Sequence, residues 1–220
     1  MLECLFTAPR SLLRDGDACV FYSLSTFWAS QLPKARFIWN WSSSSSTISK
    51  LPSGSFLFLA MLHLDCCPSL IHVLPMPIQG LRVLRTLEIM WCGDLREVFP
   101  LYTTVAKNEQ QEQESATTTV PFKLLKRIHL HELPKMQGIC RRWRIFAPEL
   151  ETVKIRGCWS LKRLPAVSSN GSKKVECDCE KECWDRLERR DPRLLITCDY
   201  KLTHPRYHKK STILRGSVLR

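Results

Sequence analysis

The chain has 220 residues, 11 cysteines and a formal net charge of +12 at pH 7. This length is sufficient for one buried hydrophobic core, and the longest apolar run, Phe56 to Leu62, is too short to cross a bilayer. The first residues lack the basic segment and long apolar run of a secretory signal. We therefore expect a cytoplasmic protein without a membrane span, in which most cysteines are reduced, small and buried.

One apolar spacing recurs five times along the chain. Leucine or another apolar residue occupies positions 1, 4, 6, 9, 12 and 15 of frames that begin at Leu24, Leu59, Leu84, Leu125 and Leu150. The last four starts are 25, 41 and 25 residues apart, and a period of 25 lies within the range of leucine-rich repeats. The longer interval is explained by a polar insertion at residues 101–121.

This spacing predicts an α/β solenoid of the irregular leucine-rich repeat type. Positions 4 and 6 of each frame alternate inward along a short strand, while their neighbours point outward. We expect four or five such strands to form a parallel sheet on the concave side, with loops and short helical turns on the convex side. No single coil can bury its apolar face alone, so stability requires stacking.

The same frames divide the chain into four parts. Residues 1–20 match no repeat and are left unassigned, whereas residues 21–167 form the repeats. Residues 168–191 are expected to form a C-terminal cap, with a strand near Lys174–Cys177 and a short helix within Glu180–Arg190 that buries Cys183, Trp184 and Leu187. Residues 192–220 form a basic tail.

Outward positions of successive strands should align in columns on the concave sheet, the surface with which repeat proteins commonly bind. The last two repeats place basic and imidazole groups there: Arg127, His129, His131, Lys154 and Arg156. The early repeats contribute Trp28 and Met61. We interpret these seven residues as partner-binding, and the basic end favours an acidic partner. For any one of them, an ordinary solvated surface remains the alternative.

Several longer phrases resemble a known family. They are PFKLLKRIHLHELPKMQGIC (residues 121–140), APELETVKIRGCWSLKRLPAV (147–167), CEKECWDRLE (179–188), RYHKKSTILRGSVLR (206–220) and FWASQLPKARFIWNW (27–41). From about residue 22 to its end, the chain resembles the C-terminal leucine-rich repeat region of plant nucleotide-binding disease-resistance proteins, particularly those of grasses. Arg189 departs from the pattern, because an aromatic residue is expected at that place in the cap.

The resemblance implies the sensor half of an intracellular immune receptor. Its protein partner would be a pathogen effector, a host target or the receptor's own other domains. The chain contains no GxxxxGK[ST] phosphate loop. We therefore expect a fragment without the nucleotide-binding domain and without a cofactor.

The sequence offers little for catalysis or metal binding. Cys177, Cys179 and Cys183 do not have the C-x₂-C spacing of structural zinc sites. His129 and His131 have no carboxylate or nucleophile at a recognisable offset. We expect neither an enzyme nor a metal site. Two other readings stay open: a charge-driven nucleic-acid or phosphate-binding protein, and a non-functional receptor remnant.

Overall fold

The structure is a computed structural model that describes residues 4–7, 21–40, 55–74, 81–100, 119–141, 144–167, 174–187 and 200–202. The helix in these ranges is α1 (Lys181–Arg186). The strands are β1 (Cys4–Thr7), β2 (Thr26–Ser30), β3 (Phe37–Asn40), β4 (Met61–Asp65), β5 (Thr86–Met90), β6 (Thr119–Pro121), β7 (Arg127–His131), β8 (Arg144–Phe146), β9 (Thr152–Arg156), β10 (Val175–Cys179) and β11 (Tyr200–Leu202).

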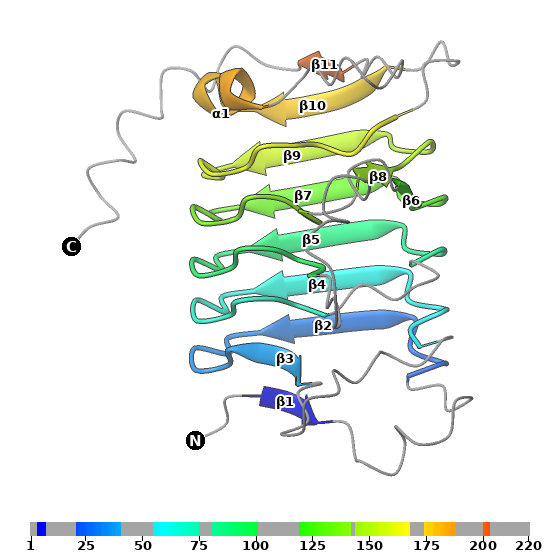
Figure 1. The fold of residues 1–220 in the computed structure, drawn as a ribbon, viewed down its shortest axis with the longest axis vertical. Helices are drawn as coiled ribbons and strands as arrows, with labels where there is room; N and C mark the ends of the chain where they lie inside the picture. The colour runs from blue at the N-terminus through cyan, green and yellow to red at the C-terminus, as the bar shows by residue number, and fades with distance from the viewer. Residues whose placement is uncertain are drawn as a thin grey trace, which may run out of the picture.

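Stacked coils form one long parallel sheet (Figure 1). Its seven strands follow the order β11-β10-β9-β7-β5-β4-β2, and every neighbouring pair is parallel. The predicted repeat solenoid is therefore confirmed. The expected number of four or five strands was too low, because β10 and β11 extend the sheet beyond the fifth repeat.

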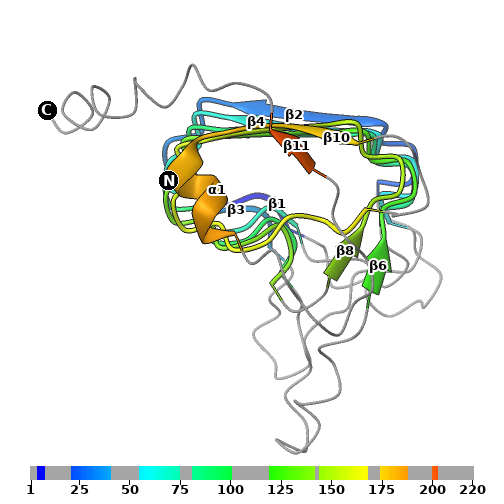
Figure 2. The ribbon, with the colours of Figure 1, turned by 90° about the horizontal axis from the view of Figure 1, so that it is seen from above.

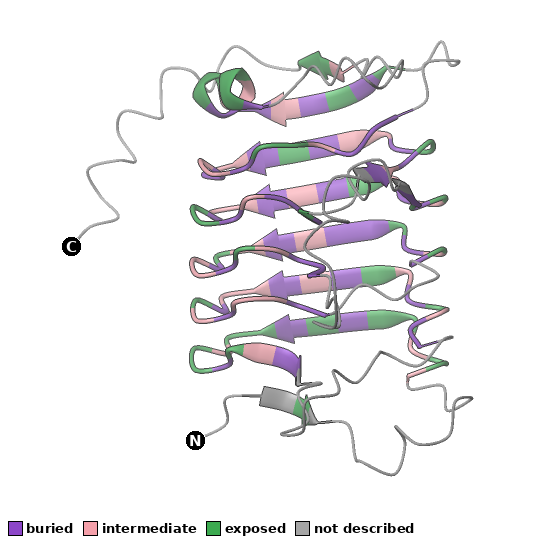
Figure 3. Cartoon of the chain, in the orientation of Figure 1, coloured by how far each residue is buried: buried purple, intermediate pink, exposed green. Residues whose placement is uncertain are grey.

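The repeat positions explain which side chains are buried. Positions 4 and 6 of the middle repeats, such as Leu87 with Ile89 and Ile128 with Leu130, are at most 1% exposed. Their burial alternates with more exposed residues along each strand (Figure 3). In an extended strand successive side chains point to opposite faces, so one face of the sheet lines the core.

Cysteine serves as a strand-end residue in three repeats. Cys67, Cys92 and Cys158 are all fully buried at position 9. Each thiol donates to the carbonyl oxygen two residues earlier, at 3.3 to 3.4 Å. Leu133 fills the same place in the fourth repeat, which shows that size and burial are the main requirements there.

The side opposite the sheet, which we call the reverse face, consists of the expected loops and turns, but in the described repeats these turns are not helical. Tight turns are joined there by a second line of parallel β-bridges that link Phe37, His72, Glu97 and Gly138. Seen along the solenoid in Figure 2, each coil is a flattened ring with the long sheet on one side. The bridges hold the reverse face in the same coil-to-coil register as the sheet.

Two small sheets complete the coils. The strand β1, which lies in the unassigned N-terminal part, pairs with β3, and the Phe6 ring stacks on Trp39 with centroids 5.7 Å apart. The strand β6 pairs with β8, so the last residues of the expected insertion form a strand. The rest of the insertion, residues 101–118, lies outside the described residues.

The C-terminal end carries the expected strand and helix. The strand β10 follows β9, and α1 buries Cys183 while Leu187 at its end is also buried. Trp184 is only partly buried. The β11 residue Tyr200 donates its hydroxyl to the Pro165 carbonyl oxygen at 2.7 Å, which ties the start of the tail to the last repeat. No helix in the described ranges is long and apolar enough to cross a membrane.

Candidate partner-binding face

The outward side chains of the long sheet form three columns, which together we call the sheet face. The strand register aligns Thr26, Met61, Thr86, Arg127, Thr152 and Glu176 in the first column and Trp28, His63, Glu88, His129, Lys154 and Asp178 in the second. The third contains Ser30, Asp65, Met90, His131 and Arg156. Adjacent members of a column are about 4.8 Å apart, because this is the spacing of paired strands.

At one end, the sheet face is aromatic and apolar. Trp28 is 68% exposed, and its ring lies 4.7 Å from the His63 ring on the next strand. Met61 is 36% exposed and sits beside Thr26, two residues away from Trp28 in the register. The structure therefore places Trp28 and Met61 on adjacent strands. Together they offer an apolar surface that a hydrophobic side chain of a partner could cover.

The centre of the face contains a histidine–glutamate contact. Nδ1 of His63 lies 2.9 Å from Oε2 of Glu88. The neighbouring His129 is half-buried, and this burial, together with Lys154, His131 and Arg156, lowers its pKa despite the Glu88 carboxylate. His129 is therefore neutral at pH 7 and adds hydrogen-bonding capacity rather than charge.

The other end is less basic than the sequence indicates. The strand β10 places Glu176 beside Thr152 and Asp178 beside Lys154. Nη2 of Arg156 lies 2.6 Å from Oδ2 of Asp178, and both side chains are about three-quarters buried. Because Arg156 is already paired, Arg127 and Lys154 are the two exposed cations of the proposed set. The expected strongly basic surface is thus a mixed one.

The proposed set consists of two groups. Trp28 and Met61 are on β2 and β4, whereas the five basic and imidazole residues are on β7 and β9, with β5 between them. A partner that contacts all seven residues must therefore extend across five strands, from β2 to β9.

Trp91 was missed by sequence reasoning. It is 46% exposed and its ring lies 5.0 Å from the His131 ring, so it extends the face beyond the end of β5. Trp91 is the residue that directly follows its strand. The equivalent residues of the other repeats are Gln31, Cys66, Glu132 and Gly157, and all five have positive φ. Repetition of this turn position could have identified it.

The cysteine cluster of the cap has no metal-binding arrangement. Among the described residues, no group of three or more histidine, cysteine or acidic side chains could hold a metal ion. Burial raises the pKa of the Cys158 thiol, and the neighbouring Cys179 does the same for Cys183. The histidines nearest to this cluster in the sequence, His204 and His208, lie outside the described residues.

Comparison with known families gives the fold a context. Residues 42–172 match the family described as plant disease resistance protein RPS2-like, leucine-rich repeats. The chain belongs to this family. The match covers more than half of the chain and includes four of the five repeats. No curated protein and no solved structure gives a significant match. Leucine-rich repeats of this family are recognition modules that mediate protein–protein contacts and are generally non-catalytic.

Proposed function

We propose that the chain recognises a protein partner in plant defence through its sheet face, with Arg127, His129, His131, Lys154, Arg156, Trp28 and Met61 as contact residues. The partner is a pathogen effector or the host protein that the effector modifies. The family match supports a resistance-protein module. The resemblance of the longer phrases to grass receptors supports placing it in the C-terminal repeat region of a cytoplasmic nucleotide-binding receptor.

The observation that carries the proposal is the alignment of outward side chains into columns. Trp28 and Met61 supply exposed apolar surface at one end, and Arg127 and Lys154 supply exposed cations on adjacent strands at the other. Interface centres are enriched in tryptophan, methionine and arginine. A rigid sheet also presents these groups without the entropic cost of ordering a loop.

The mixed charge of the face favours a protein over a nucleic acid. Glu88, Glu176 and Asp178 lie in the same columns as the cations, and they would repel a phosphate backbone. A protein partner can match both signs along the face.

The test compares Arg127→Glu and Lys154→Glu with Lys123→Glu, which makes the same charge change at an exposed position outside the three columns. Each full-length variant is expressed with an affinity tag in infected leaf tissue, and associated proteins are quantified by mass spectrometry. We expect one set of proteins to be lost with both face variants, and with Trp28→Ala, and retained with the control. Equal recovery by all variants would reject the sheet face as the binding surface.

Arg156→Glu is unsuitable for this test. In the unsubstituted protein, Nη2 of Arg156 lies 2.6 Å from Oδ2 of Asp178. The substitution would therefore place two carboxylates together in a partly buried site. Loss of binding would then report loss of structure.

A further inference from the structure

The reverse face contains a regular line of cations. Successive coils are hydrogen-bonded there through Arg36, Ile71, Arg96, Gln137 and Lys162, which we call the reverse ladder. From Ile71 onward, each residue's backbone N–H donates to the carbonyl oxygen of the preceding member, at 3.0 to 3.1 Å. This continuous hydrogen bonding fixes the positions of the side chains relative to one another.

Cations occupy every second place of the reverse ladder. Arg36, Arg96 and Lys162 are exposed, while Ile71 and Gln137 between them are half-buried. Two strand spacings separate consecutive cations, which gives about 10 Å between their backbones. Within the described ranges, none of these three side chains forms an ion pair with a carboxylate; the Arg36 guanidinium lies 5.8 Å from the centre of the Phe37 ring.

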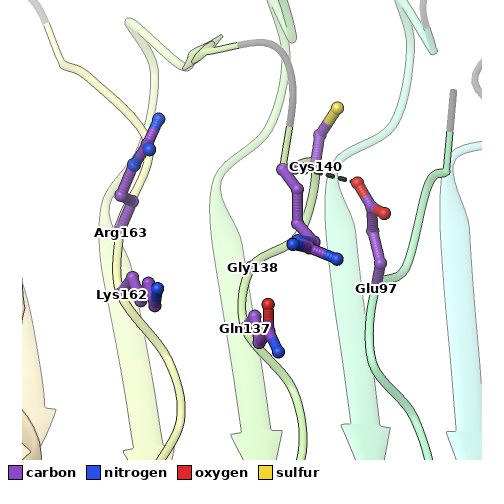
Figure 4. Close-up of a pocket in the computed structure, with 7 residues that line it drawn as sticks. Glu97, Gln137, Gly138, Cys140, Lys162 and Arg163 are labelled. Atoms are coloured by element: carbon purple, nitrogen blue, oxygen red, sulfur yellow. Dashed lines mark hydrogen bonds between the residues drawn. The ribbon is translucent and has the colours of Figure 1, made fainter.

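The surface is hollowed on both halves of the ladder. A pocket of about 480 Å³ is lined by Lys34, Arg36 and Arg96 together with Ile71. A second pocket of about 300 Å³ is lined by Gln137, Arg141, Lys162 and Arg163 (Figure 4). In that view Lys162 and Arg163 come from one coil and Gln137 from the next.

The acidic groups of this surface already have partners. Oδ1 of Asp94 accepts a hydrogen bond from the Lys135 ammonium group at 2.6 Å. The carboxylate of Glu97 accepts a hydrogen bond from the Arg141 backbone N–H. Asp94 is thus paired with a cation outside the ladder, whereas Glu97 keeps its negative charge at one place on the wall of the second pocket.

We propose that the reverse ladder binds an extended acidic segment of a protein partner, aligned with the long axis of the solenoid. An extended chain in the polyproline II conformation has three residues per turn and advances about 3.1 Å per residue, so carboxylates three residues apart lie on one side of it and recur about every 9 Å. This distance matches the spacing of Arg36, Arg96 and Lys162. Ile71 and Gln137 then face the intervening residues, offering an apolar contact and an amide for the peptide backbone.

A polyphosphate chain fits this surface less well. Its charges are continuous, so several would lie beside Asp94 and Glu97, which line the same two pockets. A peptide can leave neutral residues at those places. The proposal concerns a different face from the one assigned above, and either assignment can fail without the other.

The test uses two labelled ten-residue peptides of equal composition. The first, EGSEGSEGSE, has carboxylates three residues apart, and the second, GSGEEEESGS, has them contiguous. Binding to the full chain is measured by fluorescence anisotropy at low and high salt. We expect the first peptide to bind several-fold more tightly, and its affinity to fall as salt increases.

Variants connect this binding to the ladder. Arg96→Glu and Lys162→Glu should each weaken binding of the spaced peptide about tenfold, because an attraction between opposite surface charges becomes a repulsion. Lys123→Glu and the sheet-face variant Arg127→Glu should leave it unchanged. Circular dichroism spectra and thermal unfolding, measured for all four, identify any variant that fails to fold. Arg96→Gln replaces Arg96→Glu if the latter does not fold.

Three results would overturn the proposal. One is equal binding of the two peptides. Another is a spaced-peptide affinity that neither the folded Arg96 variant nor Lys162→Glu changes. The third is a single-stranded oligonucleotide of the same charge that binds more tightly than the spaced peptide and loses its binding in both ladder variants. That outcome would assign the reverse face to nucleic acid.

Discussion

In the five repeats, the residue that follows the sheet strand turns the chain through a left-handed conformation. Gln31, Cys66, Trp91 and Glu132 adopt φ values between 52° and 57° at this place, and Gly157 has φ 63°. Only in the last of these repeats is the residue a glycine. A Cβ on Gly157 would lie 2.7 Å from the Glu132 carboxyl group, so the close approach of the neighbouring coil explains the glycine.

Gly157→Ala should lower the free energy of unfolding by about 1–2 kcal/mol, because left-handed backbone is strained for residues with a Cβ. Removing the neighbouring carboxyl group in the double variant Gly157→Ala with Glu132→Ala should recover the part that is due to the contact. Chemical denaturation measures both. Gly93→Ala is the matched control, because its Cβ would meet nothing within 4 Å. An unchanged free energy of unfolding in Gly157→Ala would contradict both the backbone strain and the close contact with Glu132.

A second residue-scale prediction concerns pH. Burial lowers the pKa of His129 below its usual 6.5 despite Glu88, and Lys154, His131 and Arg156 act in the same direction as burial. A histidine with a lowered pKa in the folded state stabilises the protein fully above pH 6.5, and this contribution is lost as the pH falls through the folded-state pKa.

The free energy of unfolding should therefore decrease between pH 7.5 and pH 5.5. His129→Gln should make this decrease smaller. Denaturant titrations at both pH values measure the difference, and His72, whose pKa burial also lowers, accounts for a remaining slope. An identical pH dependence in His129→Gln and the unsubstituted protein would contradict the assignment.

At the scale of elements, α1 closes the end of the last repeat. The Cys183 thiol donates to the Cys158 carbonyl oxygen at 3.2 Å, and Arg186 donates to the Trp159 carbonyl oxygen at 3.3 Å. Leu187 at the end of the helix is 7% exposed. The helix has only six residues, so its contacts with the coil, and not its own propensity, keep it in place.

Leu187→Ala should therefore increase local opening of α1. Cys158 and Cys183 are buried against each other, and both should then react faster with N-ethylmaleimide under native conditions. Mass spectrometry of the alkylated sites gives the rates. Cys92, buried in the third repeat, serves as the internal reference and should be unaffected. An equal acceleration of Cys92 would indicate global unfolding instead of release of the helix.

Most elements of the solenoid follow from the sequence, because positions 4 and 6 carry strong apolar side chains in every middle repeat. The weak first repeat was also placed correctly, although Ala29 and Ala35 occupy core positions. The structure explains why it packs: Phe27, Trp39 and Phe56 supply the volume that the alanines lack, with ring centroids 4.7 and 5.0 Å from Trp39. This compensation arises across the fold and has no fixed spacing along the chain.

The candidate site was less predictable than the fold. The columns follow directly from strand register, which the repeats determine. The charge of the columns could not be predicted in the same way, because Asp178 and Glu176 belong to a segment that no repeat frame includes. Only the pairing of β10 with β9 places them beside Lys154 and Arg156. The cations of the reverse ladder were missed for a similar reason: the sequence indicated turns there without showing that they align.

At the scale of the whole molecule, each coil contacts chiefly the coils on either side. Stability in such an array depends on interfaces between neighbours, so strands with two partners should open less often than those with one. The strands β2 and β11 lie at the two ends of the long sheet, whereas β5 and β7 are central.

Amide hydrogen exchange should therefore be slowest in β5 and β7 and faster in β2 and β11. Exchange followed by mass spectrometry of peptides that cover each strand measures this gradient. Leu87→Ala, which creates a cavity in β5 at a cost of about 2–5 kcal/mol, should remove the protection of the central strands. Uniform protection from end to end in the unsubstituted protein would instead indicate a single cooperative unit.

The reverse ladder has a consequence for how the surface can change. Its side chains all occupy the same position of the repeat. The sheet-face side chains occupy three other positions, and the buried side chains occupy positions different from all of these. A substitution at Arg96 or Lys162 therefore touches neither Lys154 on the opposite side nor the leucines between them. The two faces can thus diversify separately on one unchanged interior.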